Sequence, residues 1–113
     1  MKRAEKLKLL WCYYTDAVAR YRAAIKKDAA LEKENYMEAD VQKGMEDYNQ
    51  GRMEGLEAWV WDTYLDEDNL DYQTMRDTMA RLREIAQKDA TGGVRANYKA
   101  IEHIGKEMDV DDD

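Results

Sequence analysis

The chain has 113 residues, no Pro, a single Cys and a formal net charge of −7. This length predicts one domain, and no apolar run approaches the roughly 18 residues of a membrane span, which excludes a transmembrane protein from the sequence alone. The lone Cys12 cannot form an internal disulfide, which agrees with a reducing compartment, so we expect a cytoplasmic protein that does not bind membranes.

Charge is sorted along the chain. Residues 1–27 carry eight Lys or Arg against two acids, whereas residues 28–73 carry fourteen Asp or Glu against three cations, a segment charge of −11. An acidic segment of this kind repels phosphates and attracts basic protein surfaces. The basic first segment is also expected to lie against the acidic second one, which would neutralise part of this charge.

Large apolar residues recur with helical spacing from about Arg3 to Lys27. They form one stripe, with Leu9 and Tyr13 projecting from the opposite face, where an exposed pair is expected. Asp28 is a candidate N-cap or break, although the surrounding Lys and Ala residues also suit a continuing helix. The members of the stripe are Leu7, Trp11, Tyr14, Val18, Tyr21 and Ile25.

A second, longer helix is predicted over residues 31–65. Gly44, Gly51 and Gly55 lie on or beside its apolar stripe, and each costs a helix interior about 1 kcal/mol relative to Ala. They either allow another helix to approach closely or mark a break at Gly51, and we favour a continuous helix. The stripe expected to face inward consists of Met37, Val41, Met45, Tyr48, Leu56 and Trp59.

Two shorter helices complete the prediction. One begins at a cap supplied by Asn69 or Asp71 and ends near Lys88, before Gly92 and Gly93, and the other covers residues 94–108. The expected buried residues are Tyr72, Met75, Met79, Leu82, Ile85 and Ala86 in the third helix and Val94, Tyr98, Ile101, Ile104 and Met108 in the fourth. The fold class is therefore all-α, a small antiparallel bundle of three to four helices in one domain over 1–108, followed by a flexible acidic tail at 109–113.

No motif for catalysis, metal binding or a cofactor emerges. The chain has no Ser nucleophile, and its only Cys and His, Cys12 and His103, lie far apart in sequence. The acids around Asp62, Asp66 and Asp68 lack the spacing of an EF-hand loop, because Leu70 occupies a ligand position. We expect no enzyme activity, no metal and no cofactor.

An acidic face with one aromatic residue is the strongest functional pattern. Helical projection places five acids opposite the expected core stripe of the second helix, with a Trp among them. Such an aromatic anchor ringed by carboxylates is typical of a binder of basic surfaces, although an ordinary solvated face has the same pattern. The predicted partner-binding residues are Asp40, Glu46, Asp47, Glu54, Glu57 and Trp61.

These features favour a non-enzymatic acidic module that occupies a basic, nucleic-acid-binding surface of a partner protein. In size, charge and lack of catalytic residues the chain is similar to small acidic inhibitors of phages and mobile elements, including anti-CRISPR proteins. That resemblance implies inhibition by mimicry of nucleic acid.

Two alternatives come from other classes. The apolar stripes are also compatible with a structural or assembly protein that forms a helical homodimer or larger oligomer. Direct nucleic-acid binding through the first helix would use the charges of Lys2, Arg3, Lys6 and Lys8 and the stacking groups Trp11 and Tyr13. The nearby acidic segment would oppose the approach of phosphates, so we expect none.

Overall fold

The computed structural model describes residues 3–67, 71–93 and 97–108. Four helices account for nearly all of them, α1 (Arg3–Glu32), α2 (Tyr36–Glu67), α3 (Tyr72–Gly92) and α4 (Tyr98–Met108), which confirms the all-α class. Asn69, Val94 and the acidic tail at 109–113, which the sequence analysis singled out, lie outside the described residues.

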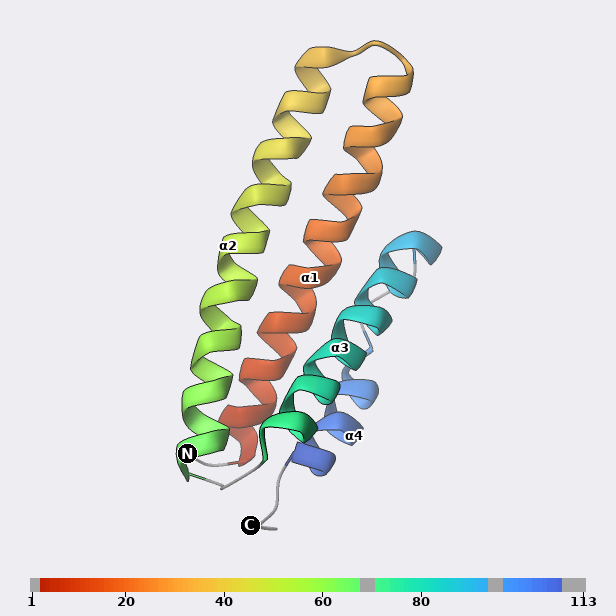
Figure 1. Ribbon diagram of the computed structural model, residues 1–113. Coiled ribbons are helices and arrows are strands. Elements are labelled where there is room, and N and C mark those ends of the chain that lie inside the picture. Colours follow the sequence, from red (N-terminus) through yellow and green to blue (C-terminus); the bar gives the residue numbers. More distant parts are fainter. Residues whose placement is uncertain (1–2, 68–70, 94–96, 109–113) are drawn as a thin grey trace.

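The two long helices form an antiparallel hairpin, and α3 and α4 pack against α1 at the hairpin's open end (Figure 1). Two ion pairs show the antiparallel direction. Asp16 of α1 pairs with Arg52 of α2, whereas Lys27, which comes later in α1, pairs with Glu46, which comes earlier in α2. The closed end of the hairpin projects beyond α3 and α4, giving the molecule principal extents of 52 × 24 × 22 Å. Part of α2 is therefore covered by α1 alone.

The turn of the hairpin lies later than the sequence predicted. The helix α1 runs through Asp28 to Glu32, so the possibility of a cap or break at Asp28 is wrong and the alternative of a continuing helix is confirmed. Ala29 and Ala30 have high helix propensity, and the burial of Ala30 further stabilises the continuation of α1. The reversal uses Glu34 in the left-handed region (φ 56°), and the Asn35 side chain accepts a hydrogen bond from the Glu38 amide at 3.3 Å.

The expectation of an unbroken second helix is confirmed, because α2 continues through Gly51. A Cβ atom added at Gly44, Gly51 or Gly55 would have no neighbour within 4 Å. These glycines therefore do not serve close packing inside the molecule, although each weakens the helix relative to Ala.

Both ends of α3 carry the predicted signals. Asp71 caps its first turn by accepting a hydrogen bond from the Thr74 amide at 2.8 Å, and bonding to Thr74 lowers the pKa of the Asp71 carboxyl. Gly93 ends the helix in the left-handed conformation (φ 66°), where Gly has no steric penalty.

The core is centred on α1 and contains Tyr and Met beside aliphatic residues. Leu9 and Tyr13 are buried, which corrects their predicted exposure, because α1 has neighbours on two sides. Conversely, Ile25, Tyr72 and Tyr98 were predicted to be buried and are exposed. The largest fully buried side chains are Leu10, Tyr13, Tyr14, Val60, Met75, Met79, Leu82, Ile101 and Ile104.

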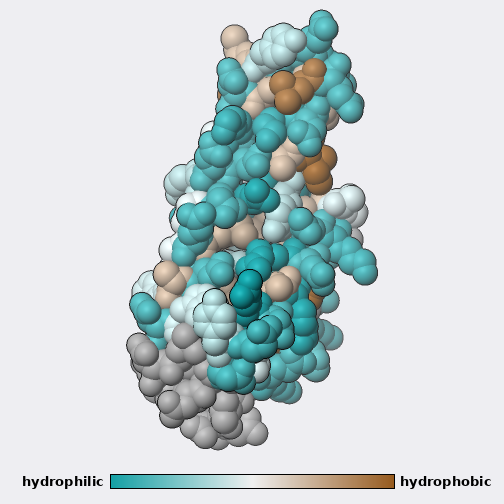
Figure 2. Space-filling view, viewed as in Figure 1, coloured by the Kyte–Doolittle hydropathy of each residue, from teal (hydrophilic) through white to brown (hydrophobic). Residues whose placement is uncertain are grey.

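None of the helices within the described ranges combines the length and apolar character needed to cross a bilayer. On the face in Figure 2 the surface is mostly hydrophilic, with hydrophobic side chains showing toward the projecting end of the hairpin.

Two glycine substitutions are expected to have opposite effects. Gly51→Ala gains helix propensity without a clash and should raise the free energy of unfolding by up to about 1 kcal/mol. Gly105→Ala would place its methyl group against the buried Leu7 side chain and should lower it by about 1 kcal/mol, because overpacking outweighs the propensity gain. Urea denaturation followed by circular dichroism measures both. A loss of stability in Gly51→Ala would contradict the open surroundings of this residue.

Candidate functional site

The six predicted partner-binding residues of α2 do not form one face of the structure. Asp40, Asp47 and Glu54 are exposed. Asp47 pairs with Lys43 one turn away at 2.9 Å, and Glu54 accepts a hydrogen bond from Gln50 at 3.1 Å. Such exposed pairs within one helix contribute little to stability, so these carboxylates can exchange partners at low cost.

Glu46 points inward at α1. Its carboxylate lies 2.8 Å from the Lys27 ammonium and 3.6 Å from the Arg20 guanidinium. Its side chain is only 15% exposed, and its hydrogen bond to Lys27 raises the pKa of that ammonium. Glu46 thus holds the hairpin together, as the predicted neutralisation between the first two helices requires.

Glu57 belongs to a polar node that joins three helices. The Tyr13 hydroxyl of α1 donates to the Glu57 carboxylate at 3.3 Å and accepts from the Arg83 guanidinium of α3 at 3.0 Å, and Arg83 lies 3.6 Å from Glu57. Burial, the largest cause, raises the pKa of Tyr13 to about 12. The node satisfies a buried hydroxyl with charged partners, which makes Glu57 a structural residue.

Trp61 is partly buried rather than presented among the acids. It packs against the core, and its ring centroid lies 4.6 Å from that of Tyr72 at the start of α3. The ring therefore supports the junction of α2 and α3.

The stripe of α2 expected to face inward is largely exposed instead. We call Met37, Val41, Met45, Tyr48 and Trp59 the outer strip; their exposed fractions run from 48% to 81%. Only Leu56 of the predicted stripe packs partly against the core. The inward side of α2 consists of Ala39, Gln42, Glu46, Met53, Glu57 and Val60.

The inward side of α2 differs from the predicted one because of the residues on the side of α1 that it contacts. Arg20 and Lys27 approach α2 there and need a carboxylate, which the opposite side of α2 supplies in Glu46. Small residues such as Ala23 and Ala39 are buried in the hairpin and let its helices approach. Apolar periodicity alone gave the wrong inward face because both sides of α2 carry apolar residues.

Shallow hollows follow the hairpin beside the outer strip. One of about 330 Å³ is lined mainly by apolar groups, including Leu9, Cys12, Leu56 and Trp59. Another of about 310 Å³ lies farther along, between Ala19 of α1 and Met45 of α2. The outer strip is thus continuous with apolar walls shared by α1 and α2.

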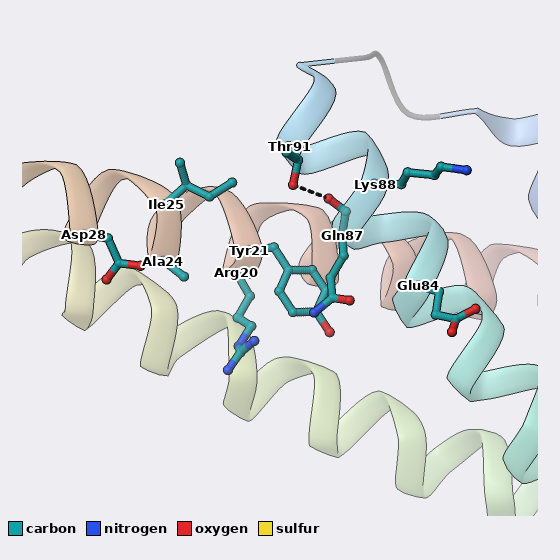
Figure 3. Close-up of a pocket in the computed structure, with 9 residues that line it drawn as sticks. All are labelled: Arg20, Tyr21, Ala24, Ile25, Asp28, Glu84, Gln87, Lys88 and Thr91. Carbon is teal, nitrogen blue, oxygen red and sulfur yellow. Dashed lines mark hydrogen bonds between the residues drawn. The ribbon is translucent and has the colours of Figure 1, made fainter.

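A larger hollow of about 570 Å³ lies between α1 and α3, but its charged groups do not converge (Figure 3). Lys88 extends away from Asp28, and the Arg20 side chain turns toward α2. The hydrogen bond drawn within it, from the Thr91 hydroxyl to the Gln87 carbonyl at 2.9 Å, belongs to the last turns of α3. The lining suggests no catalytic set.

Cys12 and His103 do not form a nucleophile and base pair in the described structure. Cys12 lines the hollow beside Trp59, whereas His103 is exposed on α4 and lies 3.5 Å from Glu107. Within the described ranges no group of three or more His, Cys, Asp or Glu side chains is placed to hold a metal ion.

Comparison with known proteins gives no match: no protein-family model, curated protein or solved structure is significantly similar to this chain.

The buried tyrosines predict a loss of stability at high pH. Burial raises the pKa of Tyr13 and of Tyr14 to about 12, and the hydrogen bond from Tyr14 to Asp89 adds to the shift of Tyr14. An unfolded Tyr ionises near 10, so the unfolded state loses these protons first, and the free energy of unfolding should fall as the pH rises from about 10 to 12.

Urea denaturation across this range measures the loss. Lys27 also has a raised pKa and therefore adds to the pH dependence of stability in alkaline solution. The variants Tyr13→Phe and Tyr14→Phe are the matched controls, because they remove only the contribution of each tyrosine. Each should reduce the pH dependence while costing about 1 kcal/mol at neutral pH through the lost hydroxyl bonds. An unchanged pH dependence in both variants would contradict the tyrosine assignment.

Proposed function

We propose that this protein is a non-enzymatic binding module that acts in the cytoplasm and occupies a basic surface of a partner protein through the outward side of α2. The observation that carries the proposal is the combination of exposed apolar groups and exposed carboxylates on one helix. Contiguous exposed apolar side chains on a soluble domain are typical of interaction sites.

The charge of α2 supports a basic partner. Between Tyr36 and Glu67 the helix has nine acids against Lys43 and Arg52. Glu46 and Glu57 are engaged with cations of α1 and α3, but Asp40, Asp47 and Glu54 face solvent. Carboxylates around an apolar contact steer association with Lys-rich and Arg-rich surfaces.

A nucleic-acid-binding channel is the partner surface that best fits this chemistry, because it is both basic and accessible. Occupying it would inhibit the partner by excluding nucleic acid, as anti-CRISPR-like proteins of phages do. Direct nucleic-acid binding by this chain is disfavoured, since Tyr13, a candidate stacking group on α1, is fully buried.

Self-association is the second candidate, favoured by the exposure of the outer strip. In this alternative the chain is a structural or assembly protein and the carboxylates only maintain solubility. Sedimentation velocity over a wide concentration range distinguishes the two, because the binding module is expected to remain a monomer without its partner.

The proposed function predicts selective, salt-sensitive capture. Tagged protein mixed with bacterial lysate should retain a basic nucleic-acid-handling protein at low salt, release it at high salt and lose it when competing DNA is added. The triple reversal Asp40→Lys, Asp47→Lys and Glu54→Lys should weaken capture at least about tenfold.

The matched control reverses three exposed acids on the other helices, Asp77→Lys, Glu84→Lys and Glu102→Lys, with the same change in net charge. It should leave capture unchanged. Equal loss in both triple variants would show that net charge alone drives capture, and insensitivity of capture to DNA would rule out a nucleic-acid channel as the occupied surface.

A further inference from the structure

The outer strip has the spacing of a helix–helix interface. Four of its members, Val41, Met45, Tyr48 and Trp59, follow intervals of 4, 3, 4, 3 and 4 residues when Arg52 and Gly55, which occupy the two positions between Tyr48 and Trp59, are included. This is the repeat by which one helix packs along another, yet no helix of the described structure covers these residues. From Met37 to Trp59 the strip is about 33 Å long, which suits a partner helix of about 22 residues.

The glycines of α2 fit the same occupant. Gly44 and Gly51 lie beside the strip and Gly55 lies on it, and no atom of the described residues comes within 4 Å of the Cβ that each would carry. Their helix-weakening effect has no compensation inside the chain. A neighbouring helix could approach the backbone of α2 closely at these positions, and its long side chains could extend past them.

Charge selects the kind of helix. Beyond the glycines, around the outer side of α2, lie the exposed carboxylates of Asp40, Asp47 and Glu54. Lys and Arg side chains can pack their alkyl stems over small residues while their charged ends reach carboxylates. The edge toward α1 carries Lys8 and Lys26, which line the hollows beside the strip, so cations of the partner belong on the outer edge only.

The same charges disfavour a second copy of this chain. Two strips face to face would bring two α2 helices together, each with nine acids against two cations. Long-range repulsion would oppose that contact, whereas a basic helix would be attracted.

We infer that the outer strip binds an amphipathic helix of a partner protein, with an apolar stripe against Met45, Tyr48 and Trp59 and Lys or Arg along the edge facing Asp40, Asp47 and Glu54. This inference rests on the proposed function and specifies the secondary structure of the bound surface. The bound element is a helix rather than an extended segment or a loop.

A synthetic peptide tests the inference with the intact protein. The probe is a fluorescent helix of about 22 residues made of Leu, Lys and Gln, with Leu at alternating intervals of 3 and 4 and Lys along one edge. A second peptide has the same composition in an order that forms no apolar stripe. Fluorescence anisotropy at low salt should show that the patterned peptide binds at least about tenfold more tightly than the unpatterned one.

Matched variants locate the contact. Met45→Glu with Tyr48→Glu should weaken binding of the patterned peptide at least about tenfold, even though the added negative charge attracts Lys. Ile25→Glu with Leu31→Glu adds the same charge at exposed apolar residues of α1 and should leave binding unchanged. Gly51→Gln should weaken binding of the patterned peptide while raising the melting temperature of the protein. Weaker binding would then result from the blocked approach of the peptide to the backbone of α2 and not from unfolding.

Three results would overturn the inference: equal binding of the two peptides, equal loss in the two double variants, or a dimer that Met45→Glu with Tyr48→Glu dissociates. The last would assign the strip to a second copy. Failure of the peptide to bind, together with DNA-sensitive capture from lysate, would refute the helical partner and leave the proposed function standing. Peptide binding without such capture would refute the proposed function alone.

Discussion

The side of α2 that faces α1 is the constraint on which the rest of the surface depends, and partly buried ion pairs between the two helices set it. Arg20 and Lys27 of α1 both reach Glu46. Removing one member of such a partly buried set leaves a charge without its partner, which is costly, so the set fixes one orientation of the helix. Asp16 and Arg52, 3.1 Å apart, fix the same register farther along.

The node of Tyr13, Glu57 and Arg83 extends this constraint to α3. The hydroxyl of the buried Tyr13 has to find partners, and here it bonds to one residue of α2 and one of α3. The carboxylates of α2 therefore divide into two groups with different roles. Glu46 and Glu57 assemble the fold, while Asp40, Asp47 and Glu54 remain on the surface.

Exposure of the outer strip follows from this arrangement. The inward side of α2 is occupied by Met53 and Val60 together with small and charged residues, so the apolar side chains of the outer strip lie outside the core. α3 and α4 complete the core on α1, and the closed end of the hairpin projects beyond both of these helices (Figure 1). The molecule thus presents apolar side chains where its acidic charge is also concentrated, and the proposed binding to a basic partner rests on this combination.

The sequence by itself determined the helical class. It also favoured the continuous second helix, limited the cap of α3 to Asn69 or Asp71 and placed its end at Gly92 and Gly93, because these features depend on local propensity and on hydrogen bonds within a few residues. It also indicated the burial of Met75, Met79, Leu82, Ile101 and Ile104, because α3 and α4 each carry a single apolar side. The candidate site was only partly accessible from sequence: Asp40, Asp47 and Glu54 are exposed as expected, whereas Glu46, Glu57 and Trp61 are engaged within the fold. Only the tertiary structure decided which side of α2 faces α1, because that choice rests on long-range pairs such as Lys27 with Glu46 and Tyr13 with Glu57, and helical periodicity carries no information about which distant residue will neutralise a charge.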